Sequence, residues 1–90
     1  MSYSENSESF NEILSGKRPS EVFNSFLLEN NILDKYDLAD MFLAHFTMLD
    51  SKVLPLIWNW RSIKSIRGIS DEQFDELIIE NMKNSGYELP

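Results

Sequence analysis

The sequence predicts an all-α fold, a compact bundle of four main helices plus a short N-terminal helix. Three observations support this prediction: only three glycines and three prolines interrupt the 90 residues, β-branched residues never alternate over a sustained stretch, and apolar residues recur at three- and four-residue intervals. A chain of this length forms one domain, so residues 1–90 are assigned to a single helical domain, with residues 1–7 frayed.

The first two helices are predicted from short apolar stripes with clear ends. The stripe at residues 10–14 stops at Gly16, a natural left-handed helix cap. A second helix begins at Pro19 or Ser20, because proline suits the first position of a helix, and it ends at residues 30–31. The two stripes consist of Phe10, Ile13 and Leu14, and of Val22, Phe23, Phe26 and Leu27.

The third helix is expected over residues 34–49, with Asp34 or Asp37 capping its start. Apolar residues cover most of its circumference, which indicates a central helix or one that also faces a partner. The main stripe is Leu38, Met41, Phe42, His45, Phe46 and Leu49, widened by Ala39, Leu43 and Met48.

The fourth helix is expected over residues 53–68, with Pro55 in its first turn, where no backbone donor is needed. Trp60 falls on the apolar stripe of this helix and is assigned to the core. Trp58 lies off that stripe, so it is either part of a second core face or a half-exposed anchor.

The fifth helix has the most complete end signals. Ser70 and Gln73 form a predicted capping box, Ile69 and Phe74 a hydrophobic staple, and Gly86 ends the helix. The apolar content, 42% of residues, is sufficient for one core. The predicted core consists of Phe23, Phe26, Met41, Phe42, Phe46, Ile57, Trp60, Phe74, Leu77 and Ile78.

Charge and composition exclude several function classes. The excess of 15 Asp+Glu over 8 Lys+Arg gives a net charge of -7, which disfavours binding to nucleic acids or anionic membranes and favours a basic protein partner. The absence of cysteine excludes disulfides and thiolate chemistry. The first ten residues have neither a basic start nor a long apolar run, so we predict a cytoplasmic protein with no membrane span.

The sequence predicts no enzyme activity, no cofactor and no metal site. His45, the only histidine, lies within an apolar stripe, where we expect a hydrogen-bonded structural role. Asp34, Asp37 and Asp40 recur every three residues but lack the alternate spacing, central glycine and terminal glutamate of an EF-hand. There is no nucleophile elbow and no glycine-rich phosphate loop.

A helix-turn-helix that reads DNA is a weaker alternative. Arg61, Lys64 and Arg67 precede residues 68–70, whose glycine, aliphatic and capping residues are typical of the turn in such a unit. The helix that would enter the major groove, however, carries four carboxylates between residues 71 and 76, and these would repel phosphates.

The acidic face of the fifth helix carries the main functional prediction. Glu72, Glu76 and Glu80 stack at four-residue intervals, and like-charge pairs at this spacing each cost roughly 0.2–0.5 kcal/mol. The face is either simply solvated or complements a basic partner. The predicted partner-binding surface is Glu72, Asp75, Glu76, Glu80, Asp37 and Asp40, to which Asp34 can contribute.

In overall description the chain is similar to the helical immunity proteins that neutralise bacterial nuclease toxins, a likeness of size, charge and helix content without a shared motif. The resemblance implies a non-enzymatic inhibitor of a basic protein in a bacterial or phage setting. The alternative is a self-associating structural or adaptor domain, a homodimer through the third helix with Leu43, Trp58 and Arg61 as interface anchors.

Overall fold

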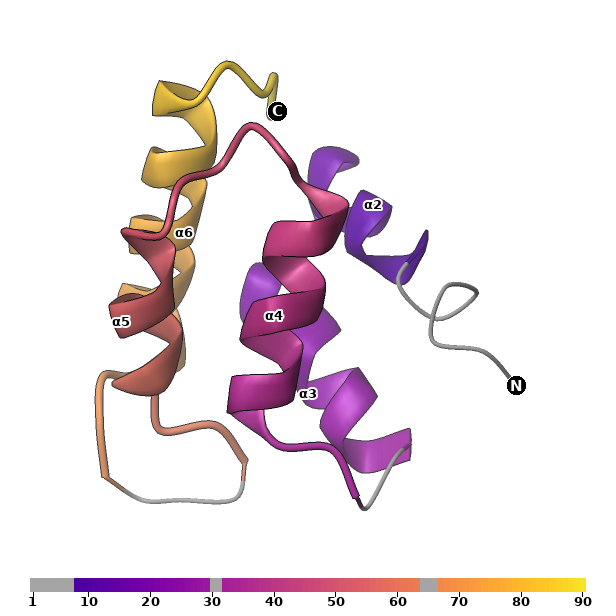
Figure 1. Ribbon diagram of the computed structural model, residues 1–90, viewed down its shortest axis with the longest axis vertical. Coiled ribbons are helices and arrows are strands. Elements are labelled where there is room, and N and C mark those ends of the chain that lie inside the picture. Colours follow the sequence, from indigo (N-terminus) through magenta and orange to yellow (C-terminus); the bar gives the residue numbers. More distant parts are fainter. Residues whose placement is uncertain (1–7, 30–31, 64–66) are drawn as a thin grey trace.

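The computed structural model describes residues 8–29, 32–63 and 67–90, and these residues confirm the all-α fold. A short 3-10 segment, η1 (Glu8–Phe10), leads into α2 (Asn11–Leu14), which is followed by α3 (Pro19–Glu29), α4 (Lys35–His45), α5 (Val53–Trp58) and α6 (Asp71–Asn84) (Figure 1). The molecule measures 32 × 31 × 22 Å.

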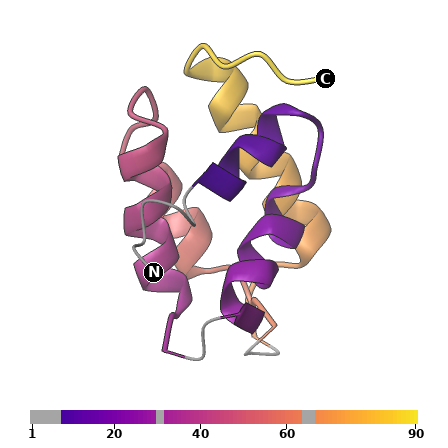
Figure 2. The ribbon, with the colours of Figure 1, turned by 90° about the vertical axis from the view of Figure 1, so that its right-hand side faces the viewer.

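The four main helices form a closed ring, because α3 and α5 each pack against both α4 and α6. Successive helices alternate in direction, so the end of α3, the start of α4, the end of α5 and the start of α6 meet at the lower end in Figure 1. Toward the other end, η1 packs against α3 and α4, and α2 packs against α3 (Figure 2).

The core between these helices is aromatic, and all six phenylalanines are buried. Phe23 lies at its centre, with its ring centroid between 5.2 and 5.8 Å from those of Phe10, Phe42, Trp60 and Phe74. The predicted core residues are buried except Met41 and Leu77, which are partly buried. The core also includes Phe10, Ile13, Val22, Leu27, Leu33, Leu38, Ala39, Leu49, Val53 and Met82.

Most helix ends follow the signals in the sequence. The Asp34 carboxylate accepts the Asp37 N–H at 2.9 Å and the Asp37 carboxylate accepts the Asp34 N–H at 3.2 Å, which makes a reciprocal capping box for α4. Ser70 Oγ accepts the Gln73 N–H at 3.2 Å at the start of α6. The glycines that follow α2 and α6 have φ of +108° and +107°, the left-handed conformation typical of a helix C-terminus.

The third predicted helix is shorter than expected, since α4 ends at His45 and not at Leu49. Phe46 leaves the helical region with φ -103° and ψ 82°. The Tyr87 hydroxyl then accepts the N–H of Met48 at 3.1 Å. The C-terminal segment thus supplies the acceptor that a further helical turn would have provided.

The fourth predicted helix is wrong over most of its length. The helix α5 ends at Trp58, residues 59–63 and 67–70 are not helical, and residues 64–66 lie outside the described residues. Ile69 N–H donates to the Asn59 carbonyl at 2.8 Å, and Arg61 N–H donates to the Ile69 carbonyl at 3.2 Å. These bonds join the two sides of the segment that follows α5.

The burial of Trp60 explains why the helix stops. Its side chain is fully buried, stacks on Phe74 at a centroid distance of 4.5 Å and donates from Nε1 to Asp71 at 2.8 Å. Beside it, a Cβ on Gly68 would lie only 2.2 Å from the Asn59 carbonyl oxygen. Gly68 therefore allows two chain segments to pass closely, and the described residues on either side of it do not form the helix that was predicted to precede a helix-turn-helix turn.

Candidate functional site

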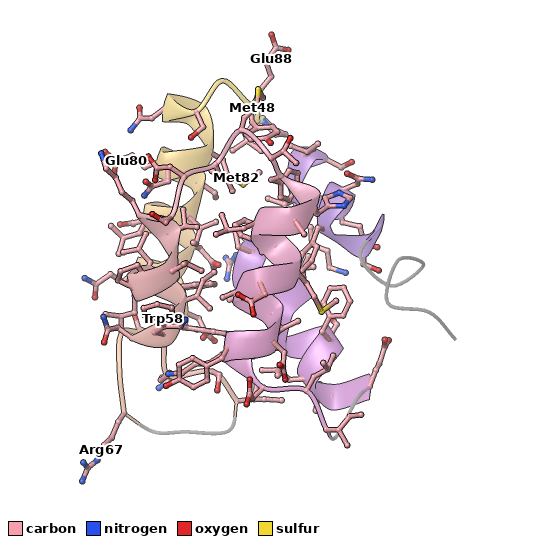
Figure 3. All side chains as sticks on the ribbon, viewed as in Figure 1. Met48, Trp58, Arg67, Glu80, Met82 and Glu88 are labelled. Atoms are coloured by element: carbon pink, nitrogen blue, oxygen red, sulfur yellow. The ribbon has the colours of Figure 1, made fainter. Side chains whose placement is uncertain are left out.

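A hollow of about 610 Å³ runs along α6 where this helix passes the start of α3. We call it the acidic groove; its lining residues are Arg18, Glu72, Asp75, Glu76, Ile79, Glu80, Lys83 and Asn84. The helical period places it there, because the apolar stripe of α6 faces the core and turns the opposite side outward. Figure 3 shows Met82 between α6 and α4, and Glu80 on the outer side of α6.

The groove carries a row of exposed carboxylates. Glu72, Glu76 and Glu80 are all exposed, and none of them makes an ion pair or a side-chain hydrogen bond within the described part of the chain. Four residues of helix rise about 6 Å, so the row extends over about 12 Å. Its negative potential is offset within the groove by Arg18 and Lys83.

Asp75 belongs to the fold and not to the exposed surface, which corrects the sequence prediction. Its side chain is 6% exposed, and its two oxygens accept the Ser20 N–H at 2.7 Å and the Ser20 Oγ–H at 2.9 Å. The first N–H groups of α3 have no acceptor within their own helix, so Asp75 caps α3 from α6. Asp75 follows the buried Phe74, and its side chain therefore lies on the side of the glutamate row that faces the core.

Burial raises the pKa of the Asp75 carboxyl above its ordinary value. The two hydrogen bonds from Ser20 and the positive charge of Arg18 lower the pKa in part, and the nearby charge of Asp71 raises it. Arg18 therefore lines the groove and also lowers the pKa of Asp75 through its positive charge. Sequence reasoning missed Arg18 and Ser20, because their proximity to α6 depends on how α3 packs.

The predicted acidic residues of α4 lie on a different surface. Asp37 and Asp40 are exposed and line a second hollow of about 240 Å³ with Ile32, Leu33 and Met41. Because Asp37 also takes part in the capping box with Asp34, two of the three α4 carboxylates serve the helix end. The structure thus divides the predicted acidic surface into two parts, of which only the α6 part forms a row.

The three residues predicted as interface anchors differ in their exposure. Trp58 is 42% exposed and lies outside the core. Arg61 is exposed, whereas Leu43 is partly buried and packs against the core. Tyr36, which sequence reasoning missed, lies with its ring centroid 6.4 Å from that of Trp58.

His45 forms part of the packing between α2 and α4. Its Nε2 lies 2.8 Å from Asn11 Oδ1, and its ring meets that of Phe46 edge-on at 4.7 Å. Among the described residues, no group of three or more His, Asp or Glu side chains is placed to hold a metal ion. None of the described helices has the length and apolarity required to cross a bilayer.

Known proteins give no indication of the function of this chain. No protein-family model matches the chain, and neither the curated proteins nor the solved structures contain a match. The acidic groove and the half-exposed Trp58 are therefore the features from which function can be argued.

Proposed function

We propose that this protein is a non-enzymatic, cytoplasmic binding domain that docks its acidic groove onto a basic protein, as an inhibitor or immunity-type factor would. The row of Glu72, Glu76 and Glu80 carries the proposal, because these carboxylates are exposed and have no cation paired with them in the described part of the chain. Like charges four residues apart repel one another, and cations from a partner relieve that repulsion.

The groove also has the apolar surface that a basic side chain requires. Ile79 is partly buried and lies between the glutamates, so the methylene groups of a lysine or arginine can pack on it while the charged head reaches Glu76 or Glu80. A helix with cations at four-residue intervals repeats the spacing of about 6 Å along the row. A partner with such a basic helix is therefore the best match to the groove.

A matched pair of charge reversals tests this proposal. The double variant Glu76→Lys/Glu80→Lys changes the groove, and Asp40→Lys/Glu88→Lys makes the same change in net charge elsewhere on exposed positions. Partners are captured from a lysate of the source cells at low salt, identified, purified and titrated against all three proteins. We expect a basic partner whose affinity falls at least about tenfold for the groove variant alone and falls with salt for the wild type.

Two results would contradict the proposal. Equal loss of affinity in both variants would mean that net charge, and not the groove, determines binding. The second is failure to isolate any basic partner whose binding to the wild type depends on salt.

A further inference from the structure

A second surface lies at the end of the bundle where α3 ends and α4 begins. Large apolar side chains gather there, with exposed fractions from 42% for Trp58 to 84% for Ile32. We call this surface the aromatic end; it consists of Leu28, Ile32, Tyr36, Trp58 and Ile63. Among the large apolar side chains described as exposed, only Met48 lies elsewhere, at the opposite end near Glu88 (Figure 3).

Specific contacts hold this surface together. Lys35 Nζ donates to the Trp60 carbonyl at 2.8 Å and lies 5.6 Å from the centroid of the Tyr36 ring. The Tyr36 ring in turn lies beside that of Trp58. The hydrogen bond of Lys35 thereby joins the first turn of α4 to the chain that follows α5, and the aromatic pair of Tyr36 and Trp58 remains half-exposed. Rigid, half-exposed aromatic side chains are common anchors of protein interfaces.

Charged side chains of both signs lie around the aromatic end. A basic residue follows α5, and an acidic residue ends α3 on the opposite side of the bundle. Arg61 is exposed and follows α5, which lies on the left in Figure 1. Glu29 ends α3, which lies across the bundle from α5 (Figure 1), and the charges of Asp34 and Lys35 lie between them at the start of α4. A phosphate-rich or anionic lipid surface would be repelled by the carboxylates, and a uniformly basic protein by Arg61.

We propose that the aromatic end binds a second copy of this chain in a twofold symmetric dimer. A twofold interface brings the same patch together from both subunits, so the basic side of one copy faces the acidic side of the other while the apolar centres meet. The charge arrangement is complementary to itself and to no surface of a single sign. The acidic groove of α6 stays outside this interface, so the dimer does not depend on the proposed function.

Sedimentation equilibrium of the full chain tests the dimer at about 150 mM salt, where the Debye length of about 8 Å screens the repulsion between two acidic molecules. We expect a concentration-dependent dimer in the wild type. Trp58→Lys and Ile32→Lys should each raise the dissociation constant at least about tenfold, because they place a cation in the apolar centre. The control Met48→Lys, at the opposite end and 55% exposed, should leave it unchanged.

The charge arrangement has its own test. With Arg61 of one copy facing Glu29 of the other, Arg61→Glu and Glu29→Lys should each weaken the homodimer. An equimolar mixture of the two variants should associate more tightly than either alone, since both contacts then join opposite charges. A wild type that is monomeric at about 1 mM would overturn the proposal, as would equal weakening by Met48→Lys or a mixture no tighter than its components.

Discussion

Asp75 illustrates how one carboxylate can serve the fold within an acidic row. Its spacing groups it with Glu72 and Glu76, but it is nearly fully buried and caps the start of α3 through Ser20. A buried carboxylate is costly unless its oxygens are hydrogen-bonded, and here both are. The bond pair also ties α3 to α6, next to the groove that we propose as the binding site.

The value of this contact can be measured with two substitutions. Asp75→Ala leaves the Ser20 N–H and hydroxyl without their acceptor, and we expect a loss of about 2–3 kcal/mol in the free energy of unfolding. Asp75→Asn keeps an oxygen for the N–H and an amide that can donate to Oγ, so we expect a change within about 1 kcal/mol. Urea unfolding followed by circular dichroism gives both values, and equal losses would refute the capping role.

The pKa of Asp75 predicts a pH dependence of known sign. Because burial raises its pKa in the folded state above the ordinary 3.8, the folded protein binds this proton more tightly than the unfolded chain does. The stability from this group is fully present below the unfolded pKa and is lost as pH rises through the folded pKa. The unfolding free energy of the wild type minus that of Asp75→Asn should therefore fall as pH rises from below 3.8 to above it.

The same urea series, repeated at each pH on both proteins, provides the measurement. Carboxylates that do not interact with Asp75 contribute equally to both proteins and cancel in the difference. A difference that rises with pH would mean that the Ser20 hydrogen bonds and Arg18 outweigh the effect of burial.

At the scale of elements, the segment between α5 and α6 is determined by packing and not by helix propensity. Residues 59–63 follow a helix and carry no glycine or proline, yet they leave the helical path. Ser62 has a left-handed φ of +57°, and Trp60 turns inward onto Phe74. The burial of a whole indole outweighs the few tenths of a kcal/mol per residue that helix propensity contributes.

Within the segment between α5 and α6, Gly68 is the position at which we expect a substitution to destabilise the fold most. Gly68→Ala would bring a Cβ within 2.2 Å of the Asn59 carbonyl oxygen, and we expect a loss of at least about 3 kcal/mol as the crossing is forced apart. Gly86→Ala is a matched control with a similar positive φ, but its Cβ would meet nothing closer than 3.8 Å. That variant should lose about 1 kcal/mol.

Thermal unfolding of both glycine variants gives the two losses. Near-ultraviolet circular dichroism also reports whether Trp60 stays packed on Phe74. If Gly68→Ala were as mild as Gly86→Ala, the close passage of the two segments would not constrain the fold.

At the scale of the whole molecule, the two proposed surfaces differ in their response to salt. The acidic groove would bind a basic partner by charge, so salt weakens that complex. The aromatic end would join two chains of net charge -7 chiefly through apolar side chains, so salt reduces the repulsion between the chains and weakens only the contacts of Arg61 with Glu29. A salt titration thus distinguishes partner binding from self-association in the same preparation.

The sequence predicted the helices best where local chemistry determines them. Asp34 and Ser70 cap α4 and α6 as expected, and Gly16 and Gly86 end α2 and α6, because caps depend on residues within one or two turns. The exposed glutamate row also follows directly from the 3.6-residue period of α6. The sequence left the exposure of Trp58 open, since its position relative to the apolar stripe was compatible with either face.

What the sequence determined by itself is the all-α fold, most helix ends, most of the core and the outward face of α6. These depend on periodicity and on short-range hydrogen bonds. Only the tertiary structure decided the end of α5, the burial of Asp75 and the gathering of apolar residues at one end. Each of these brings together residues far apart in the chain, such as Ser20 with Asp75, and their energies arise from contacts that exist only after the helices have packed.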